Sequence, residues 1–247
     1  MTAQNRSTAV MQARHEPHHS LDDFPTPPWA TRALCEWLSN ATDGKIAAQT
    51  CREPAANRGH MVWPLREYFA SVEGSDIFDY GAGFIQADYL AGPQPPMVDW
   101  TITNPPFRLA QDFIIRALSA SRVGVAMLVR SAFLEGIARH RNLFSCHPPA
   151  AVLQFTERVV IHRGKLSPKG STATAYCWLV FSTAYSEDTR LYWIAPCRKR
   201  LESASDYPGT PGITTSRTVS RSVPIATIQA VPFAPTAVRV HVPDGEA

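Results

Sequence analysis

Four consecutive residues, Asn104, Pro105, Pro106 and Phe107, have types and an order that suit chemistry on a planar amino or amide nitrogen. Such a nitrogen is a poor nucleophile because its lone pair is delocalised. The side-chain oxygen of Asn104 and the carbonyl oxygen of Pro105 can each accept one amino hydrogen, which draws the nitrogen toward a nucleophilic form without a charged base. The prolines hold both acceptors in place, and we expect Phe107 to stack on a target base. An ordinary tight turn is the alternative, since Asn-Pro pairs often begin turns.

The elements that flank this turn favour the chemical interpretation. The apolar run 98–102 is typical of a short buried strand, and residues 109–118 have the spacing of an amphipathic helix. A turn between such a strand and the next helix lies at the carboxyl end of the strand. That is the edge where α/β proteins bind their ligands.

A second group of residues has the pattern of a ligand-binding loop. Glu53 and Pro54 open this loop at the first predicted strand-to-helix turn, and the small Ala55 and Gly59 allow the backbone to approach a ligand closely. Asn57 stands where glycine is commonest, but Asn tolerates the left-handed conformation better than most residues. We therefore expect the loop to form one wall of a cofactor site.

Two acids follow the next two predicted strands. Asp76 comes about 20 residues after the loop, a position from which a carboxylate binds ribose hydroxyls. Ile77 beside it can pack on an adenine face, and Asp88 can accept a hydrogen bond from an adenine amino group. A solvated loop carboxylate explains either acid taken singly. Their placement after successive strands favours a shared ligand.

Strand patterns alternate with helix patterns, which predicts an α/β fold with an open, doubly wound, mostly parallel sheet. The predicted strands are 47–52, 72–77, a third that ends within 86–90, 98–103, 123–129 and 152–155. The predicted helices begin after Thr26, as an N-cap, and cover 61–70, 109–119 and 132–143. The β-rich segments 158–162 and 172–181 predict an antiparallel hairpin that closes the sheet edge.

The bulk composition limits the function only loosely. The net charge of +3 and the pI near 8.7 are compatible with nucleic-acid binding and do not require it. Five cysteines form no CxxC pair, which favours reduced thiols in a cytoplasm over disulfides or a zinc site. No cluster has metal-ligand spacing and no apolar run reaches transmembrane length, so we expect neither a metal nor a membrane.

The two ends of the chain differ from its centre. Residues 1–21 predict a disordered N-terminal arm. Residues 208–247 contain no Leu and are dominated by Pro, Ser, Thr and Val, which predicts a low-complexity, disordered tail.

In their order, several segments resemble those of class I S-adenosylmethionine-dependent methyltransferases, specifically the phage and prophage adenine-N6 DNA methyltransferases. The similar segments are 23–27, 53–59, 75–77, 88–90, 103–107, 171–181 and 196–200. Within the first of them, the resemblance implies that Phe24, Thr26 and Pro27 contact the cofactor.

The resemblance covers about residues 22–207 and implies one methyltransferase domain over that range. It implies a Rossmann-like, seven-stranded sheet whose last strand is antiparallel. It also implies S-adenosyl-L-methionine as the cofactor and methyl transfer to adenine N6 in double-stranded DNA.

In this hypothesis, basic residues of the loop 163–170 contact DNA phosphates, and the cluster 198–200 is a second candidate. The loop residues are Arg163, Lys165 and Lys169. Solvated surface charge explains each of them equally well. Two alternatives stay open: methylation of RNA or of a protein glutamine by the same chemistry, and a degenerate module that binds DNA or cofactor without turnover. The intact turn at Asn104 argues against the second.

Overall fold

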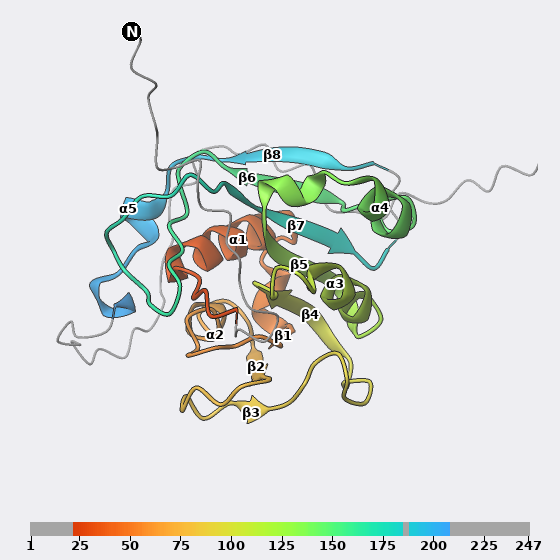
Figure 1. The fold of residues 1–247 in the computed structure, drawn as a ribbon, viewed down its shortest axis with the longest axis horizontal. Helices are drawn as coiled ribbons and strands as arrows, with labels where there is room; N and C mark the ends of the chain where they lie inside the picture. Colours follow the sequence, from red (N-terminus) through yellow and green to blue (C-terminus); the bar gives the residue numbers. More distant parts are fainter. Residues whose placement is uncertain (1–21, 185–187, 208–247) are drawn as a thin grey trace, which may run out of the picture.

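The computed structural model describes residues 22–184 and 188–207, and the predicted arm and tail lie outside this part of the chain. Its centre is one sheet in the order β3-β2-β1-β4-β5-β7-β6-β8 (Figure 1). Neighbouring strands run parallel except at β7, which is antiparallel to both β5 and β6. The strands are β1 (Thr50–Glu53), β2 (Ser71–Asp76), β3 (Ile85–Gln86), β4 (Val98–Thr103), β5 (Ser121–Arg130), β6 (Ala151–Phe155), β7 (Tyr176–Ser182) and β8 (Arg190–Ile194).

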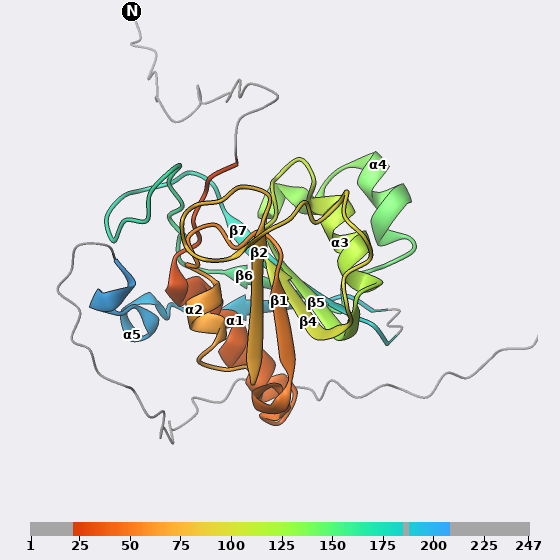
Figure 2. The same ribbon diagram turned by 90° about the horizontal axis from the view of Figure 1, so that it is seen from below.

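Helices cover both faces of this sheet, which confirms the predicted α/β class. Figure 2 shows α1, α2 and α5 on one side of the strands and α3 and α4 on the other. The helices are α1 (Pro28–Ala41), α2 (Val62–Leu65), α3 (Ala110–Leu118), α4 (Ile137–Arg139) and α5 (Arg198–Leu201). Short 3₁₀ or π segments lie at Lys45–Ala48, Ser131–Leu134, His140–Phe144 and Ala204–Asp206.

The sheet divides the core into two layers because successive strand residues point to opposite faces. On β7, Trp178 and Val180 pack in the layer that contains α1, whereas Cys177 and Leu179 pack in the layer that contains α3. The indole N–H of Trp178 donates to the carbonyl oxygen of Ala30 at 3.1 Å, so this buried ring leaves no polar atom unsatisfied. Burial on both faces explains why β7 is an almost continuous apolar run.

The C-terminal side of the sheet differs from the predicted one. The predicted hairpin of 158–162 with 172–181 is wrong, because 158–162 contributes only an isolated bridge at His162. β7 pairs with β5 and β6 instead, and it lies inside the sheet. The edge is formed by β8, which runs parallel to β6 and raises the number of strands from the expected seven to eight. Burial explains this order, since β7 is buried and β8 is largely exposed.

The start of α1 also corrects the prediction. Thr26 is not the N-cap of this helix, because the capping position is occupied by Pro27, which makes no side-chain capping bond. The Thr26 hydroxyl instead accepts a hydrogen bond from Asn104.

Two other helices are shorter than predicted. The helix expected at 61–70 ends after Leu65, and the chain continues in turns. The helix expected at 132–143 is interrupted at Gly136, whose φ of 125° is incompatible with a helix. The sequence periodicity identified both segments but not these interruptions.

Candidate active site

A cavity of about 910 Å³, including its open mouth, lies at the carboxyl edge of the parallel strands. Its walls come from the segments that follow β1, β2, β3 and β4 and from residues 22–27, which we call the N-terminal strap. Open α/β sheets bind ligands at this edge. The lining residues are Asp22, Phe24, Pro25, Thr26, Pro54, Ala55, Ala56, Asn57, His60, Met61, Asp76, Ile77, Tyr80, Asp88, Tyr89, Leu90, Asn104, Pro106, Leu109 and Phe113.

Asn104 follows β4 directly and is held by the strap. Its Nδ2 donates to the carbonyl oxygen of Phe24 and to Oγ1 of Thr26, both at 3.0 Å. Because a backbone carbonyl only accepts, the amide nitrogen and not the oxygen must face Phe24. The oxygen, Oδ1, is buried and accepts no hydrogen bond from the described residues. The strap therefore fixes Asn104 through its donors and leaves its acceptor unused.

The strap also holds the far end of the same turn. The N–H of Phe107 donates to Oδ2 of Asp22 at 2.6 Å. Between these two anchors lie Pro105 and Pro106, which have no N–H group. Of the four turn residues, Asn104 and Pro106 line the cavity, whereas Pro105 and Phe107 do not.

The ring of Phe107 is half-buried in this structure. It packs against Phe24 and Tyr176, with ring centroids 5.3 and 6.4 Å away. The guanidinium carbon of Arg130 lies 4.0 Å from the centroid of the Phe107 ring. The expected stacking of a base on Phe107 is therefore blocked by Arg130 on the face that the guanidinium covers.

The loop that follows β1 is fixed by its own backbone. Asn57 has a φ of 50°, in the left-handed region that its side chain was expected to tolerate. The N–H groups of residues 55–59 all donate within the chain, to Glu53 Oε1, Ser75 O, Asp76 Oδ2, Asn57 Oδ1 and Ala56 O in turn, at 2.7 to 2.9 Å. A phosphate-binding loop needs free N–H groups, so this loop is not built to hold one.

The cavity wall is acidic. Asp22, Asp76 and Asp88 line it, and no Lys or Arg is among the described lining residues. Burial raises the pKa of Asp76, against the opposing effect of the N–H groups of Phe78 and Asn57. The carboxylate of Asp88 accepts hydrogen bonds from the N–H groups of Leu90 and Ala91, at 2.8 and 3.1 Å.

His60 is the only histidine among the described lining residues, and it adds no charge at neutral pH. Burial, followed by the charge of Arg58, lowers the pKa of His60 below its ordinary value. The neutral imidazole leaves the acidic character of the wall unchanged.

Glu53 lies beneath the loop and not in the cavity. Its side chain is fully buried, and burial raises its pKa to about 8. The Thr103 hydroxyl and the Ala55 N–H oppose that rise, although Thr103 does not reach hydrogen-bond geometry with it. Glu53 therefore carries a proton at pH 7, and its contact with the Ala55 N–H supports the loop from below.

Two other predicted cofactor residues lie outside the cavity. Pro27 begins α1, and Gly59 packs against Trp63. A Cβ on Gly59 would lie 2.6 Å from Nε1 of Trp63, so this glycine serves packing and not ligand approach. The eight predicted residues that the structure brings together in the cavity are Phe24, Thr26, Pro54, Ala55, Asn57, Asp76, Ile77 and Asp88.

Sequence reasoning missed several lining residues, among them Asp22, Tyr80 and Phe113. An aromatic residue shortly after a strand-ending acid, as Tyr80 is after Asp76, is a usable signal. Phe113 is one of the buried residues of α3. Its place four residues after Leu109, which also lines the cavity, could have identified it.

The strap is hydrogen-bonded to the loop that follows β1 as well as to the turn at Asn104. The carboxylate of Asp23 accepts hydrogen bonds from Asn57 Nδ2 at 2.8 Å and from Arg58 Nη1 at 3.0 Å. Burial alone would raise the pKa of Asp23, but the bonds from Arg58 and Asn57 outweigh it and hold the pKa below its ordinary value. The strap thus touches both the turn at Asn104 and the loop at Asn57.

The predicted basic loop lies beside the strap. The N–H of Gly164 donates to the carbonyl oxygen of Asp23 at 2.8 Å. Arg163, Lys165 and Lys169 are exposed, lie outside the cavity, and form no ion pair within the described part of the chain. Their positions leave all three charges available to a partner.

In the second basic candidate, the cluster 198–200, both arginines are paired within the protein. Arg198 pairs with Glu202 at 2.9 Å, and Arg200 pairs with Glu36 at 2.5 Å. These pairs tie α5 to its own end and to α1. The expectation of phosphate contacts therefore shifts to the loop 163–170.

The described residues provide neither a metal site nor a membrane-spanning helix. No group of His, Cys, Asp and Glu residues there could hold a metal ion. No helix there is long and apolar enough to cross a membrane.

Neither a protein-family model nor a curated protein matches the sequence. Solved structures do match the fold. One is the methyltransferase subunit of a type I restriction-modification system from Streptococcus thermophilus, with a TM-score of 0.50, 12% identity, and coverage of 70% of this chain and 48% of that one. The chain thus spans about half the length of that protein.

Two further structures are similar at lower scores. A proposed RNA methyltransferase from Pyrococcus horikoshii has a TM-score of 0.49 and 18% identity, over 68% of this chain and 91% of its own. Magnesium protoporphyrin IX methyltransferase from Synechocystis, solved with bound S-adenosylmethionine, has a TM-score of 0.47 and 15% identity, over 63% and 78%. At such identities the similarity concerns the fold alone. The chain has the class I S-adenosylmethionine-dependent methyltransferase fold.

Proposed function

We propose that this chain transfers a methyl group from S-adenosyl-L-methionine to the exocyclic amino group of adenine in DNA. The observation that carries the proposal is the Asn104 amide, whose nitrogen is fixed by Phe24 and Thr26 while Oδ1 has no partner among the described residues. An amide oriented by two bonds, with a buried and unused acceptor, is suited to receive an N–H donor.

The charge of the cavity and the hydrogen-bond donors of its loop both fit the proposed cofactor. S-adenosylmethionine carries a sulfonium, an ammonium and ribose hydroxyls but no phosphate, and it supplies an electrophilic methyl group when bound. The acidic wall suits positive charge, and the internally used N–H groups of residues 55–59 suit a ligand without phosphate. In this assignment Asp76 holds the ribose hydroxyls, Ile77 packs on the adenine face, and Asp88 accepts from the adenine amino group.

The turn itself presents acceptors and few donors. Pro105 and Pro106 have no N–H, and the N–H of Phe107 is used by Asp22. Asn104 Oδ1 and the Pro105 carbonyl oxygen would each accept one hydrogen of an amino group, which localises the lone pair on the nitrogen. A carbonyl oxygen of a substrate would find no donor here. The turn therefore selects an –NH₂ group, as in adenine or in a glutamine side chain.

The choice of DNA over a protein substrate rests on charge beside the cavity. Arg163, Lys165 and Lys169 are exposed and unpaired within the described residues, on a loop bonded to the strap. Phosphate contacts from such residues position a nucleic acid without reading its sequence. RNA shares this chemistry, and the experiment below separates the two.

The test is methyl transfer from labelled S-adenosylmethionine to methyl-free duplex DNA, single-stranded DNA, RNA and a protein extract, with the modified nucleoside identified by mass spectrometry. We expect N6-methyladenine in DNA. Asn104→Ala should lower turnover at least about 100-fold, as for loss of an oriented dipole at a reacting centre. It should leave cofactor binding unchanged, because Asn104 is assigned to the acceptor and not to the cofactor.

The matched control is Asn142→Ala, which removes the same side chain from an exposed position in the π segment. Transfer mainly to RNA or to glutamine would overturn the DNA assignment. Calorimetric cofactor binding with no transfer to any acceptor, or full activity of Asn104→Ala, would overturn the methyltransferase mechanism itself.

A further inference from the structure

Arg130 brings a positive charge to the catalytic turn. β4 and β5 pair up to Thr103 and Met127, and β5 continues three residues beyond that pair. This extension places the guanidinium carbon of Arg130 4.0 Å from the centroid of the Phe107 ring. The side chain is therefore stacked on one residue of the turn that Asn104 begins.

The guanidinium is without a polar partner in the described part of the chain. Arg130 forms no ion pair and no hydrogen bond there, and its Nε is buried. Other partly buried arginines do have polar partners for their terminal nitrogens: Arg32 pairs with Glu67 and Asp206, and Arg116 donates to backbone carbonyls, although its Nε is unpartnered like that of Arg130. A partly buried cation with unused donors is costly unless it has a partner in the working complex.

We propose that Arg130 binds a phosphodiester group next to the target base, an inference that rests on the function proposed above. A guanidinium that stacks on an aromatic ring keeps its in-plane N–H groups free, and these fit two phosphate oxygens at once. The acidic cavity disfavours such an anion, so the phosphate belongs on the Arg130 side of the turn.

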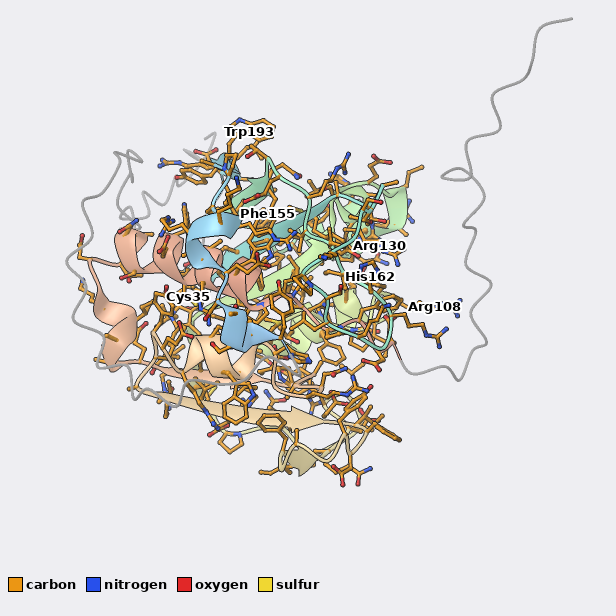
Figure 3. All side chains as sticks on the ribbon, turned by 90° about the vertical axis from the view of Figure 1, so that its left-hand side faces the viewer. Cys35, Arg108, Arg130, Phe155, His162 and Trp193 are labelled. Atoms are coloured by element: carbon orange, nitrogen blue, oxygen red, sulfur yellow. The ribbon has the colours of Figure 1, made fainter. Side chains whose placement is uncertain are left out.

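The position of Arg130 extends the basic loop toward the turn. Figure 3 shows Arg130 and His162 on the same side of the molecule, with Cys35 on the opposite side. His162 accompanies the loop residues, because its ring nitrogen lies 3.2 Å from the carbonyl oxygen of Lys169. A nucleic-acid strand bound at the loop would therefore lie on the same side of the molecule as Arg130.

The test is the salt dependence of binding of a labelled DNA duplex, measured by fluorescence anisotropy with S-adenosylhomocysteine present. One phosphate contact contributes about 0.9 to the slope of log affinity against log salt, which is roughly a 3.5-fold change in affinity between about 50 and about 200 mM. Arg130→Gln should lose this part of the slope. Arg130→Lys, which keeps the charge, should retain it.

The control is Arg122→Gln, at the amino end of the same strand, where the side chain pairs with Asp99. It should keep the wild-type slope. An unchanged slope in Arg130→Gln, or an equal loss in Arg122→Gln, would overturn the inference. Single-stranded DNA and RNA arms show which nucleic acid supplies the phosphate.

Binding and turnover separate this inference from the proposed function. If Arg130→Gln loses the slope but the wild type transfers no methyl group, the phosphate site stands and the methyltransferase proposal fails. If the wild type forms N6-methyladenine and Arg130→Gln keeps the slope, the methyltransferase proposal stands and the phosphate site fails.

Discussion

The cavity and the loop 163–170 meet at the strap, yet they differ in charge and in how their polar groups are used. The cavity has three aspartates among its described lining residues and no Lys or Arg, and the N–H groups of its loop are all bonded within the chain. The loop 163–170 has three exposed cations without ion-pair partners among the described residues. The loop of the cavity uses its N–H groups within the chain, whereas the charges of the loop 163–170 are open to a partner.

This difference indicates two ligands of opposite character. A rigid acidic wall suits a small ligand that carries positive charge and hydroxyls, because its dipoles are already oriented. Exposed cations on long side chains suit a polyanion, whose phosphates need charge more than exact geometry. Asn104 lies where the two regions meet. A residue that assists transfer of a group from a ligand in the cavity to a ligand on the basic loop must lie there.

The largest expected effect is on the basic side of this comparison. Replacing Arg163, Lys165 and Lys169 together by Gln should reduce the slope of log affinity against log salt for duplex DNA by roughly 2.7. The loss of affinity between about 50 and about 200 mM salt should then be about 40-fold smaller than in the wild type. Calorimetry should show unchanged affinity for S-adenosylmethionine. The control replaces three exposed cations outside the loop: Lys45 in the 3₁₀ segment before β1, and Arg122 and Arg190 at the amino ends of β5 and β8. If both triple variants lose the same slope, the comparison of regions fails.

A smaller effect is expected on the acidic side. Asp76→Asn should weaken cofactor binding about tenfold, since one hydrogen bond to a charged group contributes roughly 1.5 kcal/mol. Its affinity for duplex DNA should not change. Asp43→Asn is the control, because Asp43 is exposed and has a φ of 50° that Asn tolerates equally well. Calorimetry that finds equal cofactor affinity in the folded Asp76→Asn and wild-type chains would remove Asp76 from the site.

A third effect concerns stability, through the support beneath the acidic wall. Between pH 4.5, the ordinary pKa of Glu, and about 8, the folded chain holds a proton on Glu53 that the unfolded chain has lost. The free energy of unfolding should therefore fall as the pH rises through this window, by at most about 1.4 kcal/mol per unit. Glu53→Gln removes this dependence, whereas Glu135→Gln, at an exposed position, should not.

Urea unfolding of the three chains at several pH values measures these slopes. The stability of the wild type relative to Glu53→Gln should decline from pH 5 to pH 8 and then level off. A constant difference across that range would show that Glu53 is ionised in the folded chain at neutral pH.

The sequence predicted the elements whose physics is local. The strand at 98–103 was predicted with its bounds, because a short run buried on both faces has few alternatives, and the helix after it was right to within a residue at each end. The left-handed conformation of Asn57 followed from the residue type. The cavity at the carboxyl edge followed from the alternation of strands and helices.

What depends on distant parts of the chain was not predictable. The position of β7 inside the sheet depends on the neighbouring strands that bury it. The extra strand β8 forms because β6 leaves one of its edges open for pairing. The pairing of Thr26 with Asn104 joins residues 78 positions apart, so no local pattern contains it. The covering of Phe107 by Arg130 depends in the same way on strand register.

The strap is a shared support, and this has a consequence for genetics. Its six residues hold the turn through Asp22, Phe24 and Thr26 and the loop through Asp23. A screen for cofactor-binding defects and a screen for transfer defects should therefore select overlapping sets of substitutions there. Elsewhere in the domain the two sets should remain distinct.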